Sequence, residues 1–149
     1  MNDMRQSYID SFLGYGNPTA AHWFVGMEEG GVNSVVGLMD RVRAWHARGS
    51  MPLEDLIEYH RVINEDRFCS PPYPLQRTWA RLLHFKCAFL GLPANALTIR
   101  QWQHEFLGRT FSNSTLAELP PLPSSSTATW PYSELASSIP EMVSRERHR

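Results

Sequence analysis

The residues from 21 to 31 constrain the fold of this chain most, because they are typical of a buried strand that ends in a flexible loop. Residues 23–25 (Trp-Phe-Val) form a short apolar run of β-forming residues, and Gly26 ends it. The loop that follows carries two carboxylates, Glu28 and Glu29. Ligands of open α/β sheets bind at the carboxyl ends of the strands. Glu28 and Glu29 are therefore the first candidates for function.

Two interpretations of this glutamate pair stay open. A Glu-Glu pair beside glycines is also typical of a solvated turn. Adjacent residues on extended backbone point to opposite sides, so the two side chains are not expected to act as a paired acid and base. One of them can face a cleft while the other faces water.

Composition describes a globular chain of one domain. Its 149 residues are 42% hydrophobic, which is enough apolar material for a sizeable core. The formal net charge is −1 and Lys86 is the only lysine, so charge neither indicates nor excludes nucleic-acid binding. Cys69 and Cys87 have no partners at metal-ligand spacing, and the sequence has no apolar signal segment or membrane-length run. We therefore expect a reduced, cytoplasmic protein without a metal site.

Apolar residues at three-to-four spacing predict helices separated by glycine or proline. This periodicity covers a short amphipathic piece at 8–13 and longer segments at 35–48, 52–63, 77–90 and 99–107. Asn33 or Ser34 is expected to cap the first long helix, and Thr98 the last. Residues 14–18 predict a turn, and the prolines of 68–76 predict a stiff loop.

A second strand is predicted at 115–119, where the prolines of 120–123 end it. We expect it to lie parallel to strand 23–25, with the two following loops at the same edge of a short parallel sheet. Since a stable sheet needs three or more strands, we expect an incomplete sheet whose exposed edge is available for homo-oligomer formation. The polar chain 124–149 is expected to be an irregular tail that adds weak, salt-dependent DNA binding through Arg145, Arg147 and Arg149.

Two segments together carry a family resemblance. Residues 23–30, Trp-Phe-Val-Gly-Met-Glu-Glu-Gly, combine a strand with a glycine and acid turn, and residues 113–123, Asn-Ser-Thr-Leu-Ala-Glu-Leu-Pro-Pro-Leu-Pro, run a strand into a proline-rich turn. They resemble the first motif and a later site strand of the uracil-DNA glycosylase superfamily. The resemblance implies a three-layer α/β/α fold. No segment after residue 119 resembles the superfamily's last strand and His-bearing loop, which implies that this chain holds the N-terminal portion of such a domain.

Carried over to this chain, the resemblance implies roles for the first motif. Gly26-Met27-Glu28 matches the Gly-Met-Asn form of that motif, which puts Glu28 at the water-activating position and Gly26 and Met27 beside the base. Glu29 stands where the superfamily usually has Pro. In the branch whose motif is Gly-Glu-Ala-Pro-Gly the acid falls at Met27, so the choice of Glu28 depends on the branch that is followed.

The second segment and one loop supply the other implied base-binding residues. Asn113 or Ser114 aligns with the pyrimidine-reading Asn, with an ambiguity of one or two residues. This ambiguity matters because a one-residue slip turns a strand side chain to the other face. Tyr73 falls in a loop that is substrate-adjacent in the superfamily, where it would stack on a flipped base. A tyrosine packed among prolines is the alternative interpretation.

These positions imply a glycosylase-like hydrolase that releases uracil or another damaged base from DNA and needs no cofactor. Such an enzyme takes the base out of the stack and uses a carboxylate to stabilise positive charge on the sugar. The alternative is a non-catalytic nucleic-acid or nucleotide-binding module of the same fold. A third hypothesis is protein docking through an exposed segment at 120–129. Without a His-bearing loop, we expect this chain alone to be a poor or inactive glycosylase.

Overall fold

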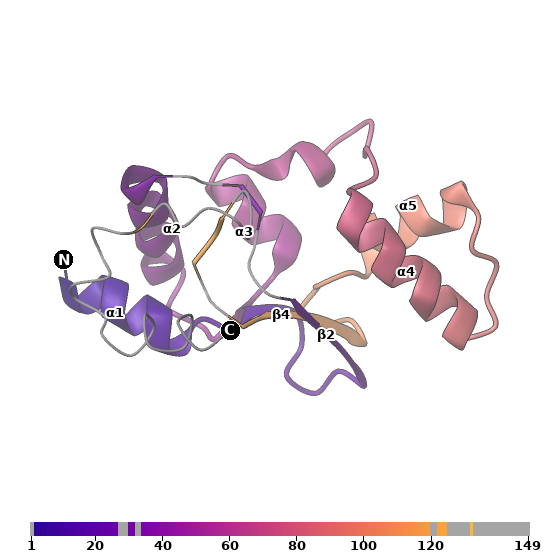
Figure 1. Ribbon diagram of the computed structural model, residues 1–149, viewed down its shortest axis with the longest axis horizontal. Helices are drawn as coiled ribbons and strands as arrows, with labels where there is room; N and C mark the ends of the chain where they lie inside the picture. The colour runs from indigo at the N-terminus through magenta and orange to yellow at the C-terminus, as the bar shows by residue number, and fades with distance from the viewer. Residues whose placement is uncertain (1, 27–29, 32–33, 120–121, 125–131, 133–149) are drawn as a thin grey trace.

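The computed structural model describes residues 2–26, 30–31, 34–119, 122–124 and 132. Its elements in chain order are α1 (Asn2–Ser11), β1 (Gly14–Tyr15), β2 (His22–Gly26), α2 (Val35–Ala47), β3 (Leu53–Glu54), α3 (Leu56–Val62), the 3-10 helix η1 (Asp66–Phe68), α4 (Arg77–Phe89), α5 (Ala96–Glu105) and β4 (Ser114–Glu118). Helices α1, α2 and α3 gather at one end of the molecule, and α4 and α5 form the other (Figure 1). Within the described residues, no helix combines the length and apolar character needed to span a membrane.

The four strands form one mixed sheet in the order β2-β4-β1-β3. The α/β class is confirmed, and so is the parallel pairing of the two predicted strands, since β2 and β4 are paired in parallel over their whole length. The sheet is nevertheless not wholly parallel, because β1 is antiparallel to β4. Gly14 permits this close pairing: its φ is +130°, and a Cβ built there would lie 2.1 Å from the carbonyl oxygen of Leu116.

The predicted helix 52–63 is wrong in its first turn. Leu53 and Glu54 instead form β3, which pairs in parallel with β1. Asp55 then caps α3, because its carboxylate accepts the backbone N–H groups of Ile57 and Glu58. The same pairing makes a strand of Gly14 and Tyr15, where the sequence predicts a turn.

Helices α2, α4 and α5 lie close to their predicted positions, whereas α1 begins six residues before the amphipathic piece at 8–13. The side chain of Ser34 caps α2 by accepting the N–H of Gly37, and α4 ends one residue before its predicted boundary. Helix α5 begins three residues earlier than predicted. Asn95 rather than Thr98 is its cap, because the Asn95 side chain accepts the N–H of Thr98.

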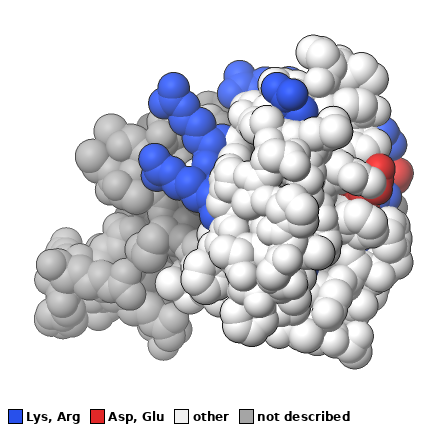
Figure 2. All heavy atoms as spheres, turned by 90° about the vertical axis from the view of Figure 1, so that its right-hand side faces the viewer, with Lys and Arg blue, Asp and Glu red and all other residues white. Residues whose placement is uncertain are grey.

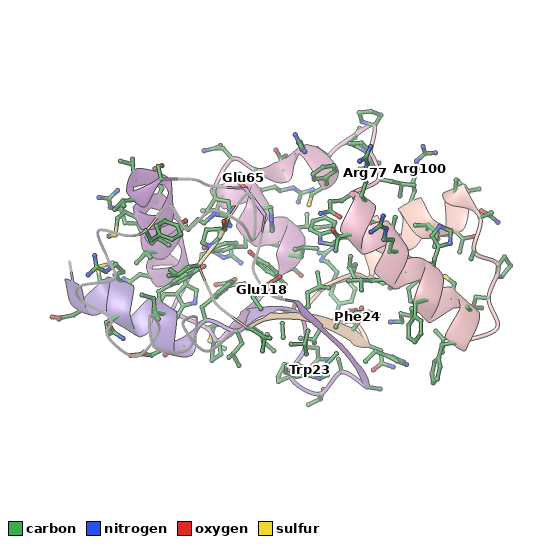
Figure 3. All side chains as sticks on the ribbon, viewed as in Figure 1. Trp23, Phe24, Glu65, Arg77, Arg100 and Glu118 are labelled. Atoms are coloured by element: carbon green, nitrogen blue, oxygen red, sulfur yellow. The ribbon has the colours of Figure 1, made fainter. Side chains whose placement is uncertain are left out.

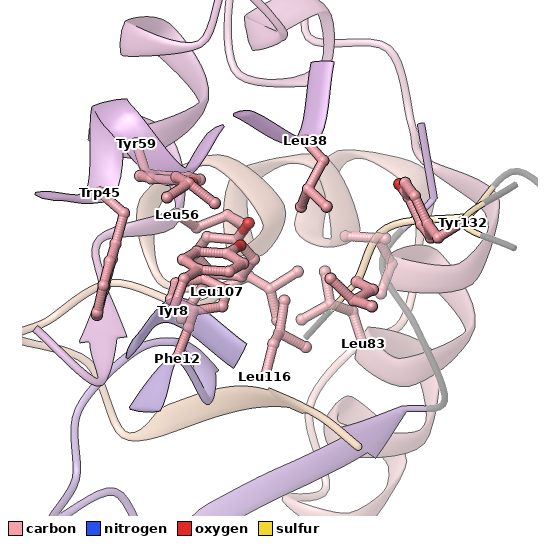
Figure 4. Packing of buried hydrophobic residues seen from close by; sticks show 14 of the residues in the cluster. Tyr8, Phe12, Leu38, Trp45, Leu56, Tyr59, Leu83, Leu107, Leu116 and Tyr132 are labelled. Carbon is pink, nitrogen blue, oxygen red and sulfur yellow. The ribbon is translucent and has the colours of Figure 1, made fainter. Parts of the chain in front are cut away.

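An aromatic cluster from α1, α2 and α3 forms the centre of the core (Figure 4). The rings of Tyr8 and Phe12 stack with their centroids 4.8 Å apart, and Trp45 meets Tyr8 edge-on at 5.3 Å. Leu122 and Tyr132 also belong to this cluster and are fully buried. Leu122 and Tyr132 thus pack against the core, although Leu122 lies in the segment expected to be exposed and Tyr132 in the expected tail.

Candidate functional site

Strands β2 and β4 end side by side at one end of the sheet, and a carboxylate lies against a glycine there. Gly26 pairs with Glu118 as the last residue pair of the two strands, and the N–H of Leu119 donates to the carbonyl of Gly26 at 3.0 Å. A Cβ built on Gly26 would lie 3.1 Å from Oε2 of the half-buried Glu118. The Glu118 carboxylate therefore lies against the backbone of Gly26; Figure 3 labels Glu118 beside Phe24 of β2. We call this place the strand-exit site.

An ion pair between a buried arginine and a half-buried glutamate lies close to Gly31, which follows the strand-exit site in the chain. Arg41 of α2, which is 1% exposed, donates to Glu65 at 2.5 Å. A Cβ built on Gly31 would lie 3.1 Å from the Glu65 carboxylate and 3.3 Å from the Arg41 guanidinium. With its φ of +135°, Gly31 lets the backbone pass this close to both charges. The ion pair thus lies close to the backbone at Gly31.

The predicted base-reading residues lie at the opposite end of β4. His22 pairs with Ser114 where β2 and β4 begin, so four residues of extended strand, about 13 Å, separate Ser114 from Glu118. The Asn113 side chain accepts the N–H of Ala21 at 2.6 Å, and the buried Ser114 hydroxyl donates to the carbonyl of Phe106. Both polar side chains join backbone segments, and the structure does not bring them together with Gly26.

Tyr73 lies in a third place, beside α5. Its ring centroid is 4.1 Å from that of His104, and its φ is +54°. The half-buried Tyr73 ring therefore packs on a helix side chain as well as standing among prolines. The remaining predicted residues, Met27, Glu28 and Glu29, lie outside the described residues, between Gly26 and Gly30.

The residue that sequence analysis missed is Glu118. It ends β4 just as Gly26 ends β2, so the argument that singled out the exit of the first strand applies equally to the second. Its signal in the sequence was its place immediately before Leu119 and the prolines that follow. Asn113, in contrast, precedes β4 and lies at the opposite end of the paired strands from Gly26.

Two groups away from the strand-exit site have shifted pKa values. Burial, reinforced by the neighbouring Asp66 carboxylate, raises the pKa of the Cys69 thiol to about 11. Burial lowers the pKa of Lys86, whose ammonium lies 4.9 Å from the centroid of the Trp102 ring and donates to the carbonyl of Asn113. The Lys86 side chain thus links α4 to α5 and to the residue before β4.

No family model, curated protein or solved structure matches this chain. Among the described residues, no three His, Cys, Asp or Glu side chains gather as a metal-binding group. The chemistry available at the strand-exit site is that of a carboxylate beside exposed strand ends. Such a carboxylate can stabilise positive charge, orient a water molecule or accept hydrogen bonds from a ligand.

Proposed function

We propose that the protein hydrolyses the N-glycosidic bond of uracil or another damaged base in DNA, with its chemistry at the strand-exit site. The observation that carries the proposal is the Glu118 carboxylate against Gly26, where two parallel strands end together. The resemblance of residues 23–30 to the first glycosylase motif supports the same place. It adds Glu28 as a second carboxylate in the loop between Gly26 and Gly30.

In this proposal the carboxylates act on the sugar. The bond between C1′ and the base nitrogen breaks, the electron pair leaves with the base, and positive charge develops on the deoxyribose. Glu28 or Glu118 stabilises that charge and orients the water whose oxygen bonds to C1′. The departing base takes up a proton, so the products are the free base and an abasic sugar.

The recognition of the base falls to groups at the strand exits rather than to Asn113. The Asn113 side chain holds Ala21 at the other end of the strands. Backbone N–H groups that follow Gly26 are suitable donors to the oxygens of a departing pyrimidine. The Arg41–Glu65 ion pair lies close to Gly31, which follows Glu28 and Glu29 in the chain.

The test is uracil release from a single-stranded oligonucleotide, with protein in excess so that slow turnover is measured in a single round. We expect Glu118→Gln and Glu28→Gln each to reduce the release rate by at least about 100-fold. The matched control is Glu58→Gln, an exposed glutamate in a surface pair with Arg61, which should keep the full rate.

Rates that are equal in all four proteins would overturn the assignment of the site. If neither uracil nor any other damaged pyrimidine tested is released, but the protein binds these bases, the protein is the non-catalytic binding module and not a hydrolase. Thermal unfolding of each variant separates loss of chemistry from loss of folding.

A further inference from the structure

We propose that the exposed face of α4 binds single-stranded nucleic acid, with arginines contacting phosphates and phenylalanines stacking on bases. We define the α4 face as Arg77, Arg81, Phe85 and Phe89. It lies at the amino end of β2, away from the strand-exit site, and it binds whether or not the protein is an enzyme. The proposal therefore goes beyond the hydrolysis of a base.

The four side chains of the α4 face form a single ridge. They are spaced four residues apart, and side chains at this spacing lie on one side of a helix, with a rise of about 6 Å for each step. All four are exposed, and the two phenylalanines are 67% and 69% exposed. Two large rings that stay about two-thirds exposed, in line with two guanidinium groups, call for a ligand that is both aromatic and anionic.

The segment of the sequence that contains this ridge carries charge of one sign. Residues 67–104 contain five Lys and Arg and no Asp or Glu, a formal charge of +5. Since the whole chain has a net charge of −1, the remaining residues sum to −6. Arg100 of α5 lies at the same end of the helix pair as Arg77 (Figure 3). The view onto this end shows several Lys and Arg groups, with acidic groups only at one side (Figure 2).

The arrangement fits a nucleic-acid strand better than a membrane surface. A helix that lies in a membrane separates its apolar face from its basic face. On α4 the arginines and phenylalanines instead share one face. Single-stranded nucleic acids supply both phosphates for Arg and unpaired bases for aromatic rings, and each stacked base contributes substantially to binding. A duplex hides its base faces, so we expect the α4 face to prefer single strands.

The ridge leads toward the strand that carries the candidate site. The ring of Phe89 meets the ring of His22 edge-on, with centroids 5.8 Å apart. His22 begins β2, and Gly26 ends it at the strand-exit site. A single-stranded nucleic acid bound on the α4 face would thus reach the amino end of β2.

The experiment measures fluorescence anisotropy of a labelled 20-residue oligothymidine, with all variants made on a Glu118→Gln background. Loss of catalysis then cannot be confused with loss of binding. We expect the double variant Phe85→Ala/Phe89→Ala to weaken binding roughly tenfold or more without changing its salt dependence. We expect Arg77→Gln/Arg81→Gln to weaken binding and to reduce the slope of log affinity against log salt by about 1.4.

Matched controls remove the same residue types elsewhere. Arg43→Gln/Arg61→Gln removes two exposed arginines of α2 and α3, and Phe111→Ala removes a ring that is 66% exposed off the ridge. Both should leave the affinity within about twofold, and the matching duplex should bind more weakly than the single strand.

Equal affinities for all variants, or no binding at low salt, would overturn the proposal. So would binding of phosphatidylserine-containing vesicles that requires the α4 face while oligothymidine binding does not. In that case the face is a membrane surface. If uracil release is absent but these binding results are obtained, the proposed hydrolysis is wrong, and the proposal that the α4 face binds single-stranded nucleic acid is still supported.

Discussion

The two ends of this molecule use the same residue types in opposite ways. At the end built from α1, α2 and α3, aromatic rings are buried against one another, and buried charges such as Arg41 and Asp55 have ionic partners. At the end built from α4 and α5, Phe85 and Phe89 face outward and the neighbouring arginines have no acid nearby in sequence. Coverage by neighbouring elements, and not residue type, decides whether a ring or a charge stabilises the fold or is left for a partner.

Truncating one phenylalanine in each region should give the largest contrast. Phe12 is 3% exposed and its ring contacts Tyr8, Tyr15 and Tyr59, so Phe12→Ala leaves a cavity and should cost about 4 kcal/mol of unfolding free energy. Phe85→Ala, on the α4 face, should change it by less than about 0.5 kcal/mol. Urea unfolding measures both. Similar losses would mean that the α4 face is part of the core.

Removing an aspartate should likewise lower the unfolding free energy more at a buried position than at an exposed one, with a smaller difference than for the phenylalanines. Asp55 caps α3 and accepts the side chain of Arg109 at 2.8 Å, so Asp55→Ala leaves a largely buried guanidinium without its partner. We expect a loss of about 3 kcal/mol. The control is Asp40→Ala, which breaks an exposed pair with Arg43 and should cost less than about 0.5 kcal/mol. Equal losses would contradict the importance of burial.

A pH titration tests the junction between the two regions, where Cys69 is buried. Its pKa of about 11 in the folded protein exceeds the ordinary value of 9.0, so folding favours the neutral thiol. The stabilisation is complete below pH 9 and is lost as pH rises to 11, by about 2 kcal/mol. Lys86, with its lowered pKa, titrates with the opposite sign. The measurement is therefore the difference in unfolding free energy between the wild type and Cys69→Ala. A difference independent of pH would contradict burial of the thiol.

The smallest expected effect is that of a substitution at the cap of α5, and it tests whether α5 unfolds together with the core. The Asn95 side chain accepts both the N–H and the hydroxyl of Thr98, so Asn95→Ala should cost about 1 kcal/mol. Since Ile99 of α5 is in the core cluster, we expect the loss in global urea unfolding. Gln101→Ala, on the exposed side of α5, is the control. A change seen only in hydrogen exchange of α5 amides would show that the two ends open separately.

The predictable parts of the fold are the ones with a strong local signal. Strand β2 and helices α2 and α4 follow from an apolar run or a helical period, and the parallel pairing of β2 and β4 from the expected order of the sheet. Strands β1 and β3 have two residues each, too few to show a period. They exist because distant segments pair, which no local pattern reveals.

The candidate site divides in the same way. The sequence indicates the exit of β2 as a place of interest, because a glycine ends an apolar run just before two acids. Only the parallel register brings Glu118 there and leaves Ser114 about 13 Å away, at the other end of β4, with Asn113 one residue further. A motif match that is ambiguous by one or two residues does not specify which residues of β4 lie beside Gly26, so the match alone could not choose among them.

The sequence by itself determined the α/β class, the two longer strands, most of the helices and the uneven distribution of charge, because these depend on residue type and spacing along the chain. The tertiary structure alone decided which rings are buried, which carboxylate reaches the strand-exit site and which face of α4 stays open. Those outcomes depend on what packs against each side chain. Phe12 packs inside the aromatic cluster, whereas Phe85 is 67% exposed and mostly contacts solvent.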